Sequence, residues 1–186
     1  MNEETRDWLV DVISGFVKNS PENSLKMEHD EKAWDEVLIG LSSGADELFE
    51  RYKDLVGENH WTPLEAFSKG FPGVVATADE LTVISWVLPQ NPRTKADNRK
   101  EDFYPSRRWV QARFPGEEFN SLLRRHVVNE LGGRGIRAVA PLLLPEWAWG
   151  KSEKYVYSSN WSERHAAYAS GLGTFGLCDG LITTKG

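Results

Sequence analysis

The chain has 186 residues, of which 40% are hydrophobic and 11% aromatic, so it can bury the core of an ordinary domain and does not resemble a disordered chain. Its single cysteine, Cys178, excludes an internal disulfide framework and a four-cysteine metal or iron–sulfur site, and four scattered histidines offer no ready metal cage. The net charge is −6, no apolar run approaches the ~20 residues of a membrane span, and the acidic start is unlike a secretory signal, so we expect a cytoplasmic protein.

The first third of the chain predicts helices. Residues 3–18 place apolar side chains at helical spacing, and residues 31–42 and 44–56 do the same. Thr62-Pro63-Leu64-Glu65 has the N-cap, the proline and the acidic third residue of a helix start. We expect that helix to be short, because Gly70-Phe71-Pro72-Gly73 follows.

The middle of the chain mixes both types of element. Residues 81–88 are apolar and β-branched and predict a buried strand, whereas residues 91–106 are polar and predict a long loop that could serve as a binding loop or lid. A helix is expected from residue 116 to about 131, where Gly132-Gly133 stops it. Residues 136–144, between prolines, predict a second strand.

The end of the chain predicts a helix over residues 160–170, with Gly171 just past its end, and a last strand over residues 181–184. Helices and strands do not alternate as βαβ units, so we expect an α+β fold. We divide it into a helical region, residues 1–75, and an α/β core, residues 76–186, packed as one compact unit.

Charge is distributed unevenly along the chain. Residues 1–90 hold 7 Lys and Arg against 18 Asp and Glu, a net charge of −11, and residues 91–186 hold 15 against 10, a net charge of +5. Seven arginines lie between residues 107 and 137 of the basic half. An anionic partner such as RNA or a phosphate-bearing cofactor is one interpretation, and a solvated face of an ordinary domain is the other. The arginines are Arg107, Arg108, Arg113, Arg124, Arg125, Arg134 and Arg137.

The segment Gly171-Leu172-Gly173-Thr174-Phe175-Gly176 matches the spacing of a dinucleotide-binding loop. That motif needs a strand before it and a helix after it, and here the expected order is reversed, which argues against a flavin or nicotinamide site. The glycines still allow close backbone approach, either to a ligand or within a tight helix-to-strand connection.

Several residues near this segment are candidates for chemistry, each with a plainer interpretation. Ser158 and Asn160 precede the expected helix, where they can bind an anion or carbonyl or simply cap the helix. Tyr157 can donate a proton or pack, and the tryptophans around residues 147–161 can stack on a flat ligand or fill the core. His165 is expected to be a surface or packing residue.

Residues 159–186, from Ser159-Asn160-Trp161-Ser162-Glu163-Arg164-His165 through the glycine segment, resemble the part of epoxyqueuosine reductases and related corrinoid iron–sulfur proteins that precedes their ferredoxin module. The Glu163-Arg164 pair and the Gly-Leu-Gly-x-x-Gly turn carry the match. Residues from about 84 to 131 resemble the family more loosely, and the first 60 residues do not obviously match.

This resemblance implies a nitroreductase-like α+β domain, with helices on a small mixed sheet, that binds cobalamin. In the family, two 4Fe-4S clusters of a following domain deliver electrons to the cobalt. The substrate is an epoxide on a tRNA nucleoside in epoxyqueuosine reductases and an organic halide in the related reductive dehalogenases. Within this chain it implies cofactor contacts from Ser158, Asn160, Arg164, Gly171, Gly173 and Gly176.

The chain departs from the family in two ways. The family's cysteine runs would follow the glycine segment and are not in this sequence, so we expect the chain to be a truncated or stand-alone relative that is inactive alone. The position of the family's acidic proton donor is occupied by Tyr157, the residue type that reductive dehalogenases use. The alternative hypothesis is a non-catalytic module that binds RNA or a protein through its basic half.

Overall fold

The computed structural model describes residues 1–27 and 31–185, which form two compact units. Unit 1 consists of Met1–Leu38 and Leu88–Gly135, and unit 2 of Ile39–Val87 and Ile136–Gly186. The division therefore differs from the expected boundary at residue 75, because each unit combines an early and a late stretch of the chain.

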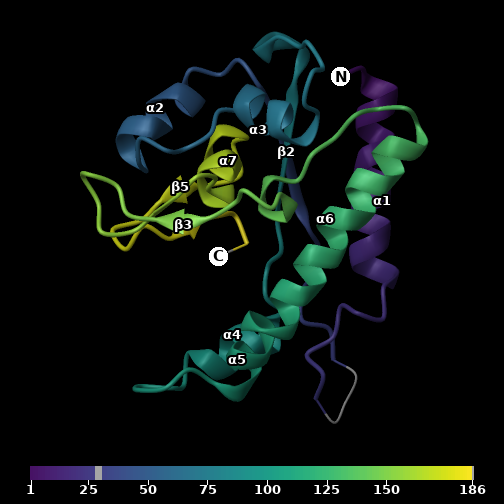
Figure 1. The fold of residues 1–186 in the computed structure, drawn as a ribbon. Helices are drawn as coiled ribbons and strands as arrows, with labels where there is room; N and C mark the ends of the chain where they lie inside the picture. Colours follow the sequence, from purple (N-terminus) through teal and green to yellow (C-terminus); the bar gives the residue numbers. More distant parts are fainter. Residues whose placement is uncertain (28–30, 186) are drawn as a thin grey trace. The chain divides into compact units, whose positions relative to one another are not determined.

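Unit 1 is helical (Figure 1). Side chains accept hydrogen bonds from helix N–H groups at the starts of three helices: Asn2 from Thr5, Asn91 from Thr94 and Ser106 from Trp109. Its helices are α1 (Glu3–Asn19), α4 (Pro92–Asn98), α5 (Arg107–Arg113) and α6 (Pro115–Gly133).

The core of unit 1 lies where α6 packs against α1 (Figure 1). Leu9 and Ile13 of α1 and Leu123 of α6 are fully buried, and the ring of Phe16 stacks on that of Phe119 with 5.6 Å between centroids. The 3.6-residue spacing of apolar side chains thus directs one face of each helix into a shared core.

A second contact in unit 1 fixes Trp34 to the start of α6. The buried Asn23 side chain donates to the carbonyls of Val17 and Trp34 and accepts from the N–H of Trp34. Trp34 Nε1 donates to the carbonyl oxygen of Gly116 at 3.3 Å, and a Cβ at Gly116 would lie 2.4 Å from Trp34 Cζ2. Position 116 therefore has room for glycine alone.

Unit 2 combines helices with three two-stranded sheets, so the expected α+β class is confirmed while the expected single mixed sheet is not found among the described residues. The sheets pair β1 with β2, β3 with β4 and β5 with β6, and the last two are antiparallel hairpins. The elements are β1 (Leu38–Ser43), α2 (Leu48–Leu55), α3 (Pro63–Gly70), β2 (Thr82–Val87), β3 (Trp149–Gly150), β4 (Ser158–Ser159), α7 (Glu163–Ala169), β5 (Thr174–Phe175) and β6 (Leu181–Ile182), with 3-10 turns at Ala78–Glu80 and Pro141–Leu143.

The core of unit 2 joins its two stretches of chain. The ring of Phe49 in α2 stacks on Trp161 with 6.1 Å between centroids, and both are buried. The end of α7 lies against the β1–β2 pair, where Ser170 Oγ hydrogen-bonds to Ser85 Oγ at 3.0 Å. A Cβ at Gly40 would lie 2.6 Å from the Ser170 carbonyl oxygen, so this close approach requires small residues.

Most of the long predicted elements are confirmed. Helix α1 covers the expected range 3–18, α6 covers 116–131, α7 lies within 160–170, and β2 lies within 81–88. The start of α3 at Thr62 is a complete capping box, in which Thr62 and Glu65 each accept a hydrogen bond from the other's backbone N–H.

Three predictions were wrong in whole or part. The range 31–42 ends in strand β1, because pairing with β2 overrides its helical spacing. The expected loop 91–106 contains α4, which Asn91 and a following proline start. The range 136–144 holds a 3-10 turn at Pro141–Leu143 and no described strand, since Pro141 has no N–H to pair.

No helix within the described part of the chain has the length and apolar character needed to cross a membrane.

The packing at the start of α6 predicts opposite effects for two glycines of that helix. Gly116→Ala should lower the free energy of unfolding by about 1–3 kcal/mol, because its Cβ clashes with Trp34. Gly132→Ala, with nothing within 4 Å of its Cβ, should raise it by roughly 0.5–1 kcal/mol. Urea denaturation of both variants measures this, and equal effects would contradict the packing described.

Candidate functional site

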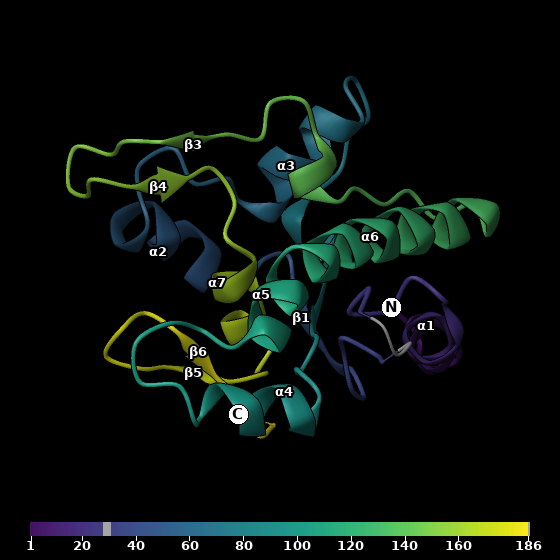
Figure 2. The same ribbon diagram turned by 90° about the horizontal axis from the view of Figure 1, so that it is seen from below.

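The site residues predicted from the sequence all lie in unit 2 but fall into two groups. Tyr157, Ser158 and Asn160 belong to the β3–β4 hairpin and its exit, whereas Arg164 and the three glycines belong to α7 and the β5–β6 hairpin. The hairpins overlap in Figure 1, but Figure 2 shows them on different sides of α2 and α7. The structure therefore does not bring the two groups together at one point.

The β3–β4 hairpin exposes large apolar side chains. Trp149 is 71% exposed, Val156 69% and Tyr157 78%, whereas Ser158 is buried. Trp149 pairs with Ser159 and Gly150 with Ser158 in an antiparallel register. The phenol of Tyr157 is thus accessible on an apolar hairpin.

Asn160 uses its side chain to hold the β3–β4 hairpin closed. Its Nδ2 donates to the carbonyl of Glu146 at 2.7 Å, and its Oδ1 accepts from the N–H of Ala148 at 3.2 Å. Its backbone carbonyl accepts from the N–H of Trp61 at 2.7 Å. These contacts assign Asn160 a bracing role in the structure.

The glycine segment is a helix end followed by a hairpin, and it does not open a helix. Gly171 has φ +72°, and the N–H groups of Gly171 and Leu172 donate to the carbonyls of Tyr168 and Ala167, as in a Schellman motif. A Cβ at Gly173 would lie 2.3 Å from the Ile182 carbonyl oxygen, and one at Gly176 would lie 2.9 Å from Ile182 Cδ1. Strand β6 therefore fills the space that the latter two glycines leave.

Arg164 braces the same hairpin. Its guanidinium donates through Nη1 to the backbone carbonyl of Asp179 and lies 3.1 Å, at Nη2, from Asp179 Oδ2. Asp179 has φ +57°, which an aspartate tolerates at a turn. The guanidinium of Arg164, for which the resemblance implies a cofactor contact, is thus engaged by Asp179 within the hairpin.

A cluster of hydrogen-bonded aromatic and histidine side chains, which no sequence motif indicates, lies at the start of α7. Ser162 Oγ lies 2.8 Å from His165 Nδ1, and the N–H of Ser162 donates to His60 Nε2 at 3.2 Å. Tyr52 Oη donates to the His165 carbonyl at 2.9 Å, and burial raises the pKa of Tyr52 to about 12. The sequence around His60 matches no motif, and His60 joins this cluster because the fold brings it next to Ser162, 102 positions later.

His165 packs as expected. Its ring lies 4.6 Å from that of Phe175 and 4.9 Å from that of Tyr52, measured between centroids, and burial lowers its pKa. Cys178 is exposed at the turn between β5 and β6. Within the described residues, no group of three or more His, Cys, Asp or Glu side chains could hold a metal ion.

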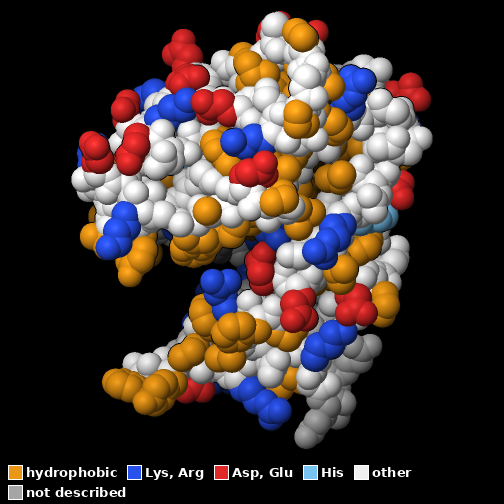
Figure 3. Space-filling view, in the orientation of Figure 1, with side chains coloured by type: hydrophobic (Ala, Val, Ile, Leu, Met, Phe, Trp, Pro, Cys, Tyr) orange, Lys and Arg blue, Asp and Glu red, His pale blue; other side chains and the backbone are white. Residues whose placement is uncertain are grey.

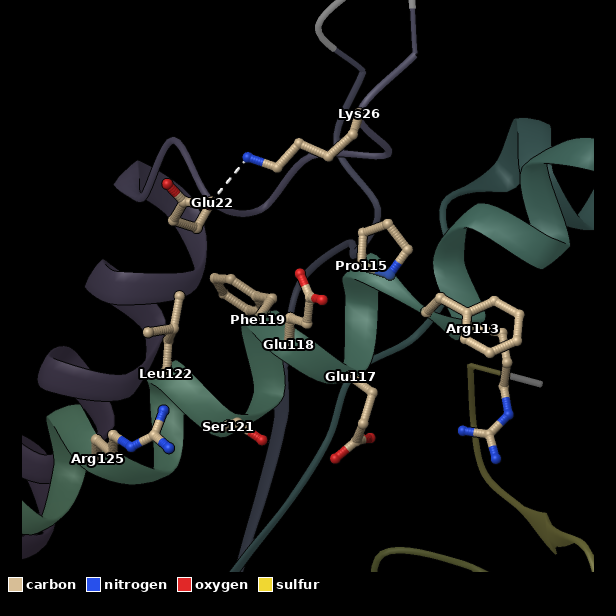
Figure 4. Close-up of a pocket in the computed structure, with 11 residues that line it drawn as sticks. Glu22, Lys26, Arg113, Pro115, Glu117, Glu118, Phe119, Ser121, Leu122 and Arg125 are labelled. Atoms are coloured by element: carbon tan, nitrogen blue, oxygen red, sulfur yellow. Dashed lines mark hydrogen bonds and ion pairs between the residues drawn. The ribbon is translucent and has the colours of Figure 1, made fainter.

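Unit 1 contains a pocket of about 780 Å³ beside the start of α6 (Figure 4). Glu22 and Lys26 form an ion pair at 2.8 Å on one side, whereas Figure 4 shows Glu117 and Arg113 directed away from that pair. The charged groups therefore do not converge on a common ligand position. The lining residues are Glu22, Lys26, Arg113, Phe114, Pro115, Glu117, Glu118, Phe119, Ser121, Leu122 and Arg125.

Three of the arginines expected to face an anionic partner have partners inside unit 1. Arg108 forms ion pairs with Glu31 at 3.0 Å and Asp97 at 2.6 Å. The buried Arg124 pairs with Glu117 at 2.8 Å. The guanidinium of Arg134 lies 3.9 Å from the ring centroid of Trp8.

Comparisons with protein families, with curated proteins and with solved structures give no match for this chain.

Substitutions in the glycine segment 171–176 can test whether its glycines are required for packing in the β5–β6 hairpin. Gly173→Ala should open the β5–β6 hairpin, because its Cβ collides with the Ile182 carbonyl, and lower amide exchange protection over residues 174–182 roughly tenfold or more. Gly171→Asn is the control, since asparagine tolerates positive φ and position 171 has open space. Unchanged protection in Gly173→Ala would contradict this packing.

Proposed function

We propose that this chain supplies the corrinoid-binding part of a reductase similar to epoxyqueuosine reductases and reductive dehalogenases. The resemblance of residues 159–186 suggests the family, and the nitroreductase-like assignment of the fold belongs to the same proposal. Its substrate would be a small organic molecule or a tRNA nucleoside.

The observation that carries the proposal is the apolar surface of the β3–β4 hairpin. Trp149, Val156 and Tyr157 are each about 70% exposed or more, although Trp61 and Trp161 of the same unit are buried. Large apolar side chains exposed on one hairpin are typical of a surface that another molecule covers. A corrin ring is broad and largely apolar, so this hairpin fits it better than the internally packed glycine segment does.

The other residues for which the resemblance implies cofactor contact are occupied within the fold. The polar atoms of Asn160 and Arg164 are used within the fold, and β6 fills the space beside Gly173 and Gly176. We therefore assign cofactor contact to the exposed side chains of the hairpin, Trp149, Val156 and Tyr157, and give the others, with the buried Ser158, the role of holding the backbone.

The described residues do not fit an iron–sulfur cluster. Cys178 is the sole cysteine of the sequence, and no described group of side chains could hold a metal ion. In the proposal, 4Fe-4S clusters belong to another module or a partner protein, so this chain alone does not turn over.

The chemistry of this chain's own residues centres on Tyr157. A bound corrinoid supplies a redox-active cobalt centre for the reductive step. The exposed phenol of Tyr157 can donate a proton from Oη to a substrate held over the hairpin, because its rigid ring fixes the hydroxyl position. The backbone of the hairpin is held by Asn160, which keeps that position constant.

Mixing the chain with cobalamin and desalting tests the proposal. We expect a shift in the corrin absorption spectrum and retained corrin, with retention about tenfold weaker in Trp149→Ala because an exposed aromatic contact is lost. Leu177→Ala, which removes an exposed apolar side chain from the other hairpin, is the matched control. No retained corrin would refute the proposal, and loss with Leu177→Ala alone would move the site to the glycine hairpin.

A second candidate function, RNA binding, is favoured by the connection between α4 and α5. Phe103 is 85% exposed and Tyr104 74%, and hydrophobic side chains stand at the end of this connection in Figure 3. Residues 93–113 hold 7 Lys and Arg against 3 Asp and Glu. Exposed aromatic rings between cations can stack on unpaired bases while the cations contact phosphates.

This candidate predicts salt-sensitive binding to single-stranded RNA. Affinity should fall roughly twentyfold between 50 and 200 mM salt if about three phosphates are contacted. A Phe103→Ala, Tyr104→Ala double variant should weaken binding by a further factor of about ten or more, since each stacked base contributes ~1–3 kcal/mol. Trp149→Ala serves as the exposed-aromatic control, and salt-independent binding or none would exclude this function.

A further inference from the structure

Two segments of unit 2 run side by side at the start of α7, and a histidine ring completes their pairing. The N–H of Trp61 donates to the carbonyl of Asn160 at 2.7 Å. Two residues after Asn160, the N–H of Ser162 donates to His60 Nε2 at 3.2 Å. In an ordinary β-ladder the acceptor of such an N–H is a backbone carbonyl. An imidazole nitrogen accepts a hydrogen bond only when it carries no proton, so this contact requires a neutral His60 with its proton on Nδ1.

The surroundings of His60 disfavour a charged ring. Its side chain is 2% exposed, its ring stacks on Trp161 and meets the edge of Tyr52, and its Nδ1 is buried without a hydrogen-bond partner among the described residues. A cation at this position would be surrounded by aromatic rings and would face the N–H of Ser162.

The titratable and charged groups near His60 come from three helices. They are Tyr52 and Lys53 of α2, Glu65 of α3 and His165 of α7. The pKa of His60 is lowered from its ordinary 6.5 to about 4, chiefly by burial and also by His165 and Lys53, against the opposing effects of the Trp61 backbone and Glu65.

The start of α7 is connected to both hairpins. Asn160 directly follows β4 and holds the β3–β4 hairpin closed through Glu146 and Ala148. On the other side, Ser162 Oγ is hydrogen-bonded to His165 Nδ1, and the ring of His165 packs on Phe175 of β5. Residues 160–162 therefore connect the two groups of predicted site residues.

We propose that His60 is a proton-operated latch, whose neutral ring holds residues 160–162 in place and whose protonation releases the start of α7 together with the two hairpins. Protonation removes the acceptor for the Ser162 N–H and places a second donor opposite it. The latch itself rests on contacts within unit 2, whereas its consequence for a cofactor on the β3–β4 hairpin rests on the proposed function.

The direction of the pH dependence follows from the lowered pKa. Above pH 6.5 His60 is neutral in both the closed and the open state, and the latch holds fully. Between pH 6.5 and about 4 the open state binds a proton that the closed state does not, so opening increases up to about tenfold per pH unit as the pH falls. The latch therefore opens with acid.

Amide exchange of the full chain without any cofactor tests the latch. Protection factors for residues 160–175 should fall between pH 7 and pH 5, while those of α1 in unit 1 stay constant. In His60→Gln the side-chain oxygen can still accept from Ser162 but cannot be protonated, so the pH dependence of these residues should disappear. His126→Gln, which alters a stacked histidine of unit 1, should leave it unchanged.

A titration of the wild-type His60 ring by NMR keeps the test decisive if His60→Gln fails to fold. We expect His60 to remain neutral at pH 6 and the Ser162 amide to shift as the ring protonates. Titration near pH 6.5 without a change at Ser162, or wild-type pH dependence retained in His60→Gln, would overturn the latch. Because no cobalamin is present, either outcome is independent of whether the chain binds a corrinoid.

Discussion

Unit 2 holds together through the contact between residues 39–87 and 136–186, and Trp161 is part of the buried core that joins them. Trp161 stacks on Phe49 and His60. On either side of it, the carbonyl of Asn160 accepts a hydrogen bond from the N–H of Trp61, and the N–H of Ser162 donates to His60 Nε2. Helix α7 begins directly after Ser162. Helix α7 and the ends of the two hairpins next to it are therefore positioned by a stretch of chain about 100 residues earlier. This dependence explains why a buried, neutral histidine at position 60 matters to both hairpins.

The glycine segment illustrates how one spacing can serve two physical purposes. In a dinucleotide-binding loop the glycines admit a phosphate to a helix start, whereas here they end α7 and allow β6 to approach the backbone. A Schellman end at Gly171 and the tight contact of Gly173 with Ile182 together require this pattern, without any ligand. The Arg164–Asp179 pair then closes the hairpin from outside.

Local signals predicted much of the fold, and long-range contacts account for the rest. The capping box at Thr62 and the apolar spacing of α1 and α6 depend on neighbours within a few residues, so the sequence reveals them. Strand β1 forms because it pairs with β2, some 40 residues away, which its helical spacing conceals. The site follows the same rule: Gly171 was placed correctly at a helix end, whereas the contact of His60 with Ser162 spans 102 residues and leaves no local pattern.

The charge of the chain shows why the order of residues along a sequence is a poor guide to surfaces. The halves differ sharply, with −11 and +5, yet unit 1 holds 14 Lys and Arg against 16 Asp and Glu, and unit 2 holds 8 against 12, giving −2 and −4. Each unit draws on both halves, so acidic residues such as Glu31 pair with arginines such as Arg108, 77 positions later. A local surface, such as the exposed rings and cations of residues 93–113, is therefore a better indication of an anionic partner than the basic half as a whole.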